Sequence, residues 1–309
     1  VMKILYFGDC TDGAMGIIHR DIKSIIDERY TDIQFELIDW AEPSNYVKLF
    51  NQKEWKNWDL IIIDPYMASV LDSGWLFKDL PIEEQNELKA KFIPVYHHEV
   101  DVPADHFNHG WYEGWFTTPV CSTNPYIVNQ IRERGCEGAL LPIGVNLKRF
   151  TPFKQINKIE RLGFVGTSPK DDWNSIKRPS MFHEICRAAN LRAITISGRK
   201  NGKDMYHDVD AIICTSTAEG LPMHFAEAAA CKIPFISTNV GIVRYYDKVS
   251  KFETVEEAVE IINQINESSD ILNEYSAQIY DELFPDRGWE NILEKYWIPH
   301  FKKMYKRNA

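Results

Sequence analysis

Short apolar runs alternate with helical patterns along the chain. In the first half, runs rich in β-branched and aromatic residues predict strands over 4–7, 59–63, 92–96, 120–121 and 139–141. Between the first two runs, Ile18, Ile22 and Ile25 fall on one face and predict a helix over 17–26. Alternation of short buried strands with helices is typical of a parallel sheet that is covered on both faces.

A second series of the same kind follows. Strands are predicted over 162–165, 193–196, 211–214 and 234–236, and helices over 181–189, 225–231 and 255–265. The intervening segment 142–158 contains prolines and lysines without periodicity, which indicates a linker. The pattern therefore predicts an N-terminal domain over 1–150, a C-terminal domain over 151–285, and a terminal helix over 286–309.

Composition narrows the class of protein. A length of 309 residues favours two domains, and the net charge of −10 disfavours broad binding to nucleic acid or to anionic membranes. Six scattered cysteines without a CxxC pair predict reduced thiols and a cytoplasmic protein. We expect no signal peptide, because the first apolar run lacks a small-residue cleavage site.

The most informative segment is 210–236, where a predicted strand runs into a polar loop and a helix opens near Pro222. Gly220 permits close approach of a ligand to the backbone, and the start of the helix favours an anion. Glu219 stands in the loop, and Glu227 lies near the second helical turn, where a carboxylate can accept two hydroxyls of a ribose. These features predict a nucleotide-sugar site.

The segment from Glu219 to Glu227 resembles the E-x7-E signature of retaining GT-B glycosyltransferases, family-4 type. The run 141–152 is similar to that family's domain junction, and 161–166 is similar to the first strand and glycine turn of its second domain. Residues 238–241 match the place of a later family glycine. The matches span about 139–245.

The resemblance implies a GT-B-like α/β fold, with two Rossmann-like domains and a cleft between them. It implies that the domain over 1–150 is the acceptor side, that the domain over 151–285 binds the nucleotide-sugar, and that the helix over 286–309 packs back on the N-terminal domain. It implies transfer of a sugar from a nucleoside diphosphate donor with retention, without metal and without a cofactor. Glu219 would hold a hydroxyl of the donor sugar and act as a catalytic residue, and Glu227 would hold the ribose. The other expected donor-binding residues in these motifs are Gly13, Gly16, Gly166, Gly220, Leu221, Pro222 and Met223.

The expected diphosphate clamp departs from the family pattern. An arginine usually follows the glycine of the second-domain turn, but Thr167 stands there in this chain. Arg178 is the first candidate for the clamp, Lys177 the second and Arg199 a reserve, with Lys170 as an alternative.

His97 and His98 end the strand over 92–96, where the family often has a histidine that faces the donor sugar. We expect one of them to be catalytic and prefer His98. Two other interpretations of the segment stay open, a metal cluster with the nearby acidic residues and a solvated loop. The aromatic stretch 107–116 could be an acceptor platform or part of a core, and Asp208 to Asp210 is interpreted as structural.

The sequence thus predicts a retaining glycosyltransferase whose acceptor is a glycan or a lipid-linked sugar. A catalytically inactive nucleotide-sugar-binding protein, a transferase acting on modified DNA and a nucleotide-sugar epimerase are the alternatives. Contact with a membrane is expected to be peripheral at most, through the basic residues of the terminal helix.

Overall fold

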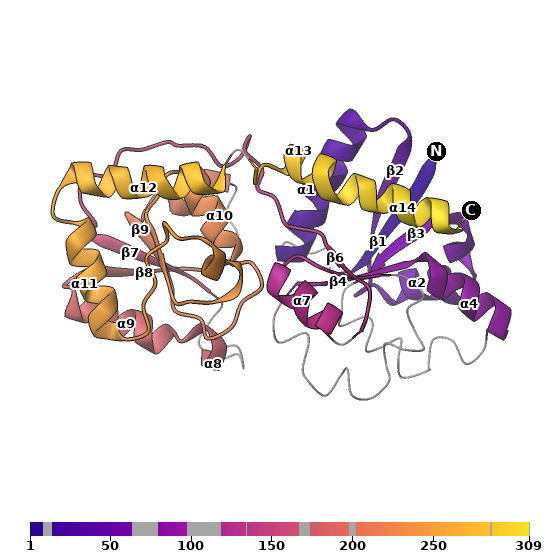
Figure 1. Cartoon of the computed structure of the whole chain (residues 1–309), viewed down its shortest axis with the longest axis horizontal. Coiled ribbons are helices and arrows are strands. Elements are labelled where there is room, and N and C mark those ends of the chain that lie inside the picture. The colour runs from indigo at the N-terminus through magenta and orange to yellow at the C-terminus, as the bar shows by residue number, and fades with distance from the viewer. Residues whose placement is uncertain are drawn as a thin grey trace. The chain divides into compact units, whose positions relative to one another are not determined.

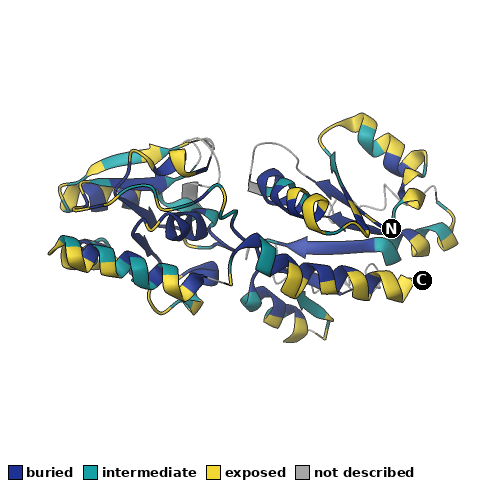
Figure 2. Cartoon of the chain, turned by 90° about the horizontal axis from the view of Figure 1, so that it is seen from above, coloured by how far each residue is buried: buried dark blue, intermediate teal, exposed yellow. Residues whose placement is uncertain are grey.

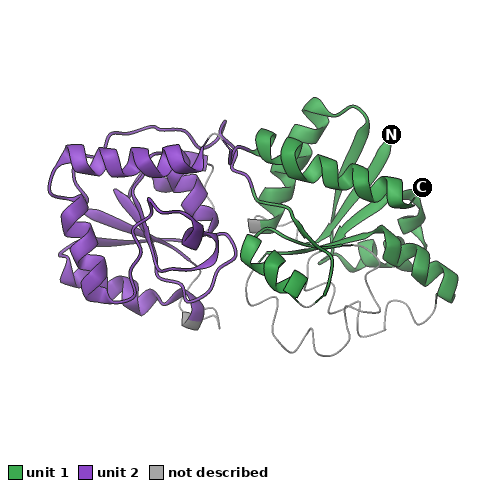
Figure 3. Cartoon of the chain, viewed as in Figure 1, with its two compact units in different colours: residues 1–143, 289–309 green, residues 144–288 purple. Residues whose placement is uncertain are grey.

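The structure is a computed structural model that describes residues 1–8, 14–63, 80–97, 119–133, 135–166, 174–197, 202–284 and 286–308. The chain forms two compact units (Figure 3), one made of residues 1–143 with 289–309 and one of residues 144–288. The divisions fall at 143/144 and 288/289, whereas the pattern of the sequence placed them at 150/151 and 285/286.

The first unit is built on a parallel sheet of six strands in the order β2-β1-β3-β4-β5-β6. The strands are β1 (Met2–Gly8), β2 (Ile33–Asp39), β3 (Leu60–Ile63), β4 (Phe92–Tyr96), β5 (Val120–Ser122) and β6 (Gly138–Leu140). Sequence patterning missed β2. This strand lies at the edge of the sheet and is only half-buried over most of its length, so it lacks the continuous apolar run of its neighbours.

Helices cover both faces of this sheet (Figure 1). The N-terminal part contributes α1 (Ala14–Arg29), α2 (Pro43–Tyr46), α4 (Ile82–Lys91) and α7 (Pro125–Glu133), with short helical turns η1 (Val47–Asn51) and η2 (Glu54–Asn57). The apolar face predicted for α1 is confirmed, because Ile18, Ile22 and Ile25 are buried.

The end of the chain returns to the first unit as α13 (Trp289–Ile292), η6 (Leu293–Trp297) and α14 (Ile298–Asn308). The indole of Trp297 donates a hydrogen bond to the carbonyl of Pro142 at 2.8 Å, and the Asn308 amide donates to the carbonyl of Ala90 at 2.9 Å. Phe301 packs beside Phe35 of β2, with ring centroids 6.5 Å apart. The first unit is therefore discontinuous in sequence.

The second unit has its own parallel sheet of four strands in the order β10-β9-β7-β8. The strands are β7 (Arg161–Val165), β8 (Arg192–Ile196), β9 (Ala211–Cys214) and β10 (Phe235–Ser237). The helices are α8 (Asn174–Lys177), α9 (Pro179–Ala188), α10 (Met223–Ala230), α11 (Val255–Ile265) and α12 (Ser269–Leu283), with turns η4 (Gly202–Tyr206) and η5 (Gly241–Tyr245). Strands β9 and β10 are buried along their length, whereas β8 at the edge of the sheet is intermediate or exposed throughout (Figure 2).

Local chemistry explains where these elements begin. Helix α11 starts at a capping box, in which the Thr254 side chain accepts from the Glu257 amide and the Glu257 carboxylate accepts from the Thr254 amide. At the start of β9, Asp210 accepts two hydrogen bonds from the Arg161 guanidinium and two from the backbone amides of Glu160 and Arg161. Asp210 thus ties β9 to β7, as expected for a structural residue.

Within the described part of the chain, no helix is long and apolar enough to cross a membrane.

Candidate active site

The predicted donor residues of the second unit gather beyond the carboxyl end of β9, where ligands bind in open parallel sheets. The loop 215–222 leaves β9 and leads into α10, which begins at Met223 after Pro222. Leu221 and Pro222 are buried at this junction and Met223 is half-buried. Gly166 follows β7, the strand next to β9, and its amide donates to the Ile196 carbonyl at 3.3 Å.

Glu219 is the most strongly engaged side chain of this loop. Its carboxylate is only 4% exposed, and Oε1 accepts hydrogen bonds from Lys177 Nζ and, at 2.7 Å, from Ser216 Oγ. Lys177 lies at the end of α8, so two separate segments meet at this carboxylate. The structure therefore brings together two residues that the resemblance placed in one donor site, Glu219 as a catalytic residue and Lys177 as a candidate diphosphate ligand.

The charge of Glu219 is set by opposing effects. Burial raises the pKa of the carboxyl, but the nearby Lys177 and His224 and the hydrogen bonds from Lys177 and Ser216 outweigh it, so the pKa lies below its ordinary value. Glu219 is thus an ionised carboxylate in a buried position at neutral pH. A buried charge with one amine partner is costly to maintain, and such charges concentrate at functional sites.

The Arg178 guanidinium is engaged by backbone carbonyls of the Glu219 loop. Its Nε donates to the Thr215 carbonyl at 2.5 Å, and a terminal nitrogen lies 3.4 Å from the Ser216 carbonyl. The Thr215 hydroxyl in turn donates to the carbonyl of Lys177 at 2.6 Å, and the Thr217 amide donates to the carbonyl of Ile176 at 2.7 Å. Arg178 therefore fastens the Lys177 segment to the Glu219 loop.

Gly241 supports the same loop from the other side. Its φ is +50°, and a Cβ at this position would lie 2.8 Å from the Glu219 carbonyl and closer still to that of Gly220. The next amide, of Ile242, donates to the Gly220 carbonyl at 2.9 Å. Only glycine meets both the backbone conformation and the close approach, which gives this later glycine of the resemblance a physical role.

Glu227 lies one helical turn into α10 and is 2% exposed. Its Oε2 accepts a hydrogen bond of 2.6 Å from the hydroxyl of Tyr206, at the end of η4. Seven of the eight residues of α10 are buried. A carboxylate on such a helix is held to a narrow range of positions, as recognition of a diol requires.

Of the predicted site residues that the structure describes, two belong to the first unit. Gly16 is a buried residue in the first turn of α1, and His97 follows β4 and is half-buried. The His97 ring lies edge-on to His19 of α1 at 6.3 Å, and His19 itself stacks on Tyr6 of β1 at 3.4 Å. This group of aromatic rings lies at the carboxyl end of β4 and involves α1, the helix that carries Gly16.

Three predicted site residues, Gly13, His98 and Arg199, lie outside the described residues, as do Thr167, Lys170 and the aromatic stretch 107–116. Among the residues that are described, no three His, Cys, Asp or Glu side chains gather as a metal site requires. The expectation of metal-free chemistry stays a prediction.

Sequence reasoning missed several residues of the site. Ser216 belongs to the polar loop that the sequence marked, but its bond to Glu219 depends on how that loop folds. Thr238 follows β10, and its hydroxyl donates to the Ser216 carbonyl at 2.6 Å. Tyr206 comes from a turn with no recognisable motif and reaches Glu227 only through the fold.

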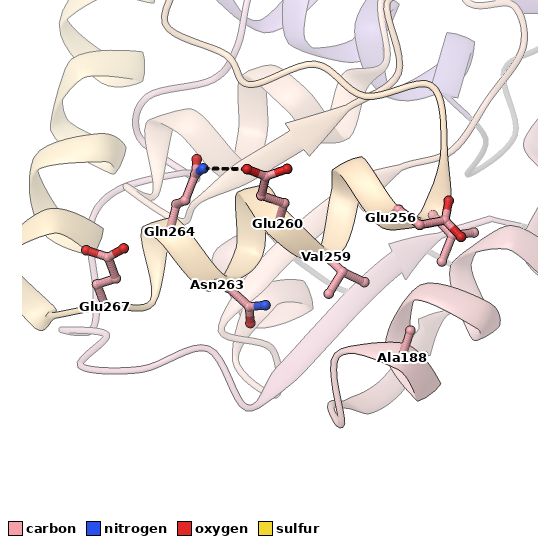
Figure 4. Close-up of a pocket in the computed structure, with 8 residues that line it drawn as sticks. Ala188, Glu256, Val259, Glu260, Asn263, Gln264 and Glu267 are labelled. Carbon is pink, nitrogen blue, oxygen red and sulfur yellow. Dashed lines mark hydrogen bonds between the residues drawn. The ribbon is translucent and has the colours of Figure 1, made fainter.

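A separate groove lies between the end of α9 and the outer face of α11 (Figure 4). Its side chains include Glu256, Glu260 and Glu267, and Gln264 donates to Glu260 at 3.2 Å. The groove shares no residue with the carboxylate site.

The chain has the GT-B fold of two Rossmann-like units, as its likeness to solved structures shows. Residues 147–268 match the family model described as "Glycosyl transferases group 1". The GT-B resemblance expected from the sequence is confirmed. No curated protein sequence matches this chain.

Solved structures with the same fold are distant in sequence. TarM of S. aureus, solved with UDP and α-GlcNAc-glycerol, has a TM-score of 0.60 at 12% identity, covering 83% of this chain and 59% of TarM. The catalytic domain of starch synthase IV from Arabidopsis thaliana, bound to ADP and acarbose, has a TM-score of 0.62 at 8% identity, covering 99% of both chains. WaaG, a glycosyltransferase involved in lipopolysaccharide biosynthesis, has a TM-score of 0.55 at 11% identity over the full length of both. The chain thus spans less than two thirds of TarM.

Proposed function

We propose that this chain is a retaining glycosyltransferase that moves a sugar from a nucleoside diphosphate sugar to an acceptor hydroxyl. The observation that carries the proposal is the ionised, buried Glu219, held by Lys177 beyond the carboxyl end of β9 and followed on the next helix by Glu227. The two carboxylates suit the two ends of a nucleotide-sugar, the donor sugar and the ribose, and the basic group beside them suits the diphosphate in the middle.

The residues would divide the work as follows. Glu227 binds the ribose, Glu219 binds a hydroxyl of the donor sugar, and Lys177 neutralises the diphosphate. We favour Lys177 over Arg178 for the diphosphate because the Arg178 guanidinium is engaged by the Thr215 and Ser216 carbonyls. Lys177 would then exchange its Glu219 partner for phosphate when the donor binds, which leaves the Glu219 carboxylate to the sugar.

In the proposed reaction, the bond from the anomeric carbon to the diphosphate oxygen breaks, and a bond to the acceptor oxygen forms on the same face. The departing diphosphate takes the acceptor proton, and its growing negative charge is stabilised by Lys177. Positioning of the two substrates supplies the remaining part of the rate. Of the two histidines that follow the strand over 92–96 in sequence, His97 and His98, we keep His98 as the preferred candidate for contact with the donor sugar.

For the acceptor, we propose a glycan or a lipid-linked sugar. Of the proteins with this fold, TarM is described with a glycerol glycoside and WaaG as acting in lipopolysaccharide biosynthesis. The net charge of −10 provides no general attraction for nucleic acid, which disfavours a DNA acceptor. Membrane contact would be limited to the basic side chains of α14, several of which pair with Asp32 and Glu137 of the same unit.

The test is a screen of UDP-, GDP-, ADP- and TDP-sugars by thermal shift and turnover, with and without EDTA. We expect one donor to raise the melting temperature and to be slowly hydrolysed in EDTA, with the anomeric configuration retained in the product. Glu219→Gln should lower turnover about 100-fold. Glu227→Ala should weaken donor binding about tenfold, since it removes a charged hydrogen-bond acceptor.

Glu256→Gln, an exposed carboxylate in the groove on α11, is the matched control and should change neither property. If the protein binds a donor but neither hydrolyses it nor transfers its sugar to any sugar acceptor, the protein is a nucleotide-sugar-binding protein and not an enzyme. If the protein converts the donor to an epimer when no acceptor is present, the reaction is epimerisation and not transfer. If none of the nucleotides binds, the proposal is wrong.

A further inference from the structure

The hydroxyl of Tyr206 makes a short contact with the carboxylate that we assign to the ribose. It donates to Glu227 Oε2 at 2.6 Å, and Tyr206 is fully buried while Glu227 is 2% exposed. Hydrogen bonds to an ionised acceptor are stronger than neutral ones, above all where water is excluded. The contact therefore restrains the carboxylate in one orientation about its side-chain torsions.

The orientation matters for the recognition of a diol. A carboxylate has about four acceptor positions on its two oxygens, and the Tyr206 hydroxyl occupies one of those on Oε2. A vicinal diol is bound well only when both of its hydroxyls meet acceptor positions at once. A carboxylate that rotates would lose one of the two bonds for part of the time, and with it some affinity for the ribose.

Tyr206 is held by a segment distant in sequence, 146–154, which we call the junction segment. The Lys154 amine donates to the carbonyls of Tyr206 at 3.0 Å, of His207 at 3.2 Å and of Val209, which accounts for its three N–H bonds. Burial lowers the pKa of this amine. Removing Lys154 would leave three carbonyls without their common donor.

A second connection joins η4 to the junction segment. The Lys203 amide donates to the Arg149 carbonyl at 3.2 Å. Gly202 has a φ of +58°, and a Cβ there would lie 2.8 Å from that carbonyl, so only glycine allows the approach. The ring of Phe150 also packs against Tyr206, with centroids 6.3 Å apart. Both ends of the turn are thus fastened to the junction segment.

We propose that Tyr206 is a positioning residue that sets the Glu227 carboxylate for the ribose of the donor, and that the junction segment holds Tyr206 in place. The inference rests on the proposed function, because it takes Glu227 to be the ribose ligand. The inference adds a specificity determinant that lies outside every motif found in the sequence. It predicts that Tyr206 strengthens recognition of the ribose hydroxyls indirectly, by orienting Glu227.

The test is the Tyr206→Phe variant of the full chain, which deletes one oxygen and keeps the ring. Binding is measured for UDP, ADP and GDP, each beside its 2′,3′-dideoxy counterpart. We expect wild type to bind one ribonucleotide more tightly than its dideoxy form. Tyr206→Phe should lose about fivefold to tenfold in affinity for that ribonucleotide while its affinity for the dideoxy form stays within about twofold.

Tyr275→Phe is the matched control, since it also deletes a buried hydroxyl in the second unit. The Tyr275 hydroxyl donates to the Phe235 carbonyl at 2.6 Å and accepts from the Ser250 amide. This variant should lose stability without changing the preference for the ribonucleotide. A merely structural role for Tyr206 would lower the affinities for both nucleotide forms alike, as would a partly unfolded protein.

The outcomes separate the two proposals. If wild type binds none of the nucleotides, the proposed function fails and this inference fails with it. If wild type prefers the ribonucleotide and Tyr206→Phe keeps the full preference, only the positioning role is wrong. Loss of the preference in Tyr206→Phe, matched by its loss in Glu227→Ala and its persistence in Tyr275→Phe, supports the inference.

Discussion

At the scale of single residues, the Lys177–Glu219 pair decides the charge of the site. The carboxylate is buried among Lys177, Ser216 and His224, and its pKa is lowered even though burial acts in the opposite direction. A carboxyl with a lowered pKa in the folded state adds stability above the unfolded pKa, and this stability is lost as the pH falls through the folded value. Removing the Lys177 amine should therefore reverse the sign of the pKa shift of Glu219.

Lys177→Met tests this reversal. The pKa of Glu219 should rise above its unfolded value, because burial then acts without the nearby amine, and the second unit should lose about 3 kcal/mol at neutral pH. The variant should gain stability relative to wild type as the pH falls, since its folded state then binds the extra proton. The measurement is the free energy of unfolding of both proteins between pH 4 and about 8.

The double variant Lys177→Met with Glu219→Gln is the control, because it removes both charges. It should recover a large part of the loss and show a flatter dependence on pH than the single variant. Equal pH dependence in the single variant and in wild type would mean that Lys177 does not set the charge of Glu219.

At the scale of elements, the docking of α14 on the first sheet places a histidine in an unusual setting. His300 is buried, and its Nε2 lies 3.3 Å from the Sγ of Cys121 on β5. Burial lowers the pKa of His300 to about 4; Lys303 acts in the same direction and Glu137 against it. The imidazole is therefore neutral where α14 packs, and its protonation opposes docking.

The acid stability of the first unit should reflect this histidine. Because the folded pKa is lower than the ordinary value of about 6.5, the unfolded chain binds the proton first as the pH falls. Stability is full above about pH 6.5 and declines towards pH 4, by roughly 3 kcal/mol for this one group. Tryptophan fluorescence is a suitable probe, since Trp173 is the only tryptophan within 144–288.

His300→Gln is the comparison, because it keeps a polar side chain of similar length that does not titrate. Other carboxyls also titrate in this range, so the difference between the two proteins is the relevant quantity. That difference should shrink or change sign between pH 6.5 and 4. A constant difference across this range would rule out His300 as the source.

At the scale of the whole molecule, the two units differ in how they are assembled from the chain. The second unit is continuous, whereas the first needs residues 289–309 to complete it. Trp289, Trp297 and Phe301 of this returning segment are almost fully buried. Burying a large apolar side chain stabilises by about 1.5–3 kcal/mol, so the three together rival the whole stability of a typical domain.

Truncation should separate the units. In a chain that ends at residue 288, the first unit should no longer unfold cooperatively. The fragment 144–288 should fold by itself and bind nucleotides with the same affinity as the full chain. Circular dichroism with tryptophan fluorescence measures the first effect, and titration with UDP, ADP and GDP measures the second. Retention of a cooperatively folded first unit in the 1–288 chain would contradict this view of the returning helix.

The helices and strands that were predicted correctly are those whose formation depends on residues that are close together in the sequence. Helix α11 was predicted over its full length, because apolar residues recur on one face from Val255 to Ile265. The central strands were predicted because burial on both faces requires continuous apolar runs. The edge strand β2 was missed because it is half-buried over most of its length and lacks such a run.

For the candidate site, the sequence by itself determined the spacing of Glu219 and Glu227 and the loop and helix that carry them. Only the tertiary structure decided their partners, because Lys177 and Tyr206 lie 42 and 21 residues away and meet the carboxylates through the packing of parallel strands. The tertiary structure also decided that the Arg178 guanidinium bonds to backbone carbonyls, a role that could not be predicted from its charge. Spacing along the chain is a local property, whereas the partner of a buried charge depends on which segments the fold brings together.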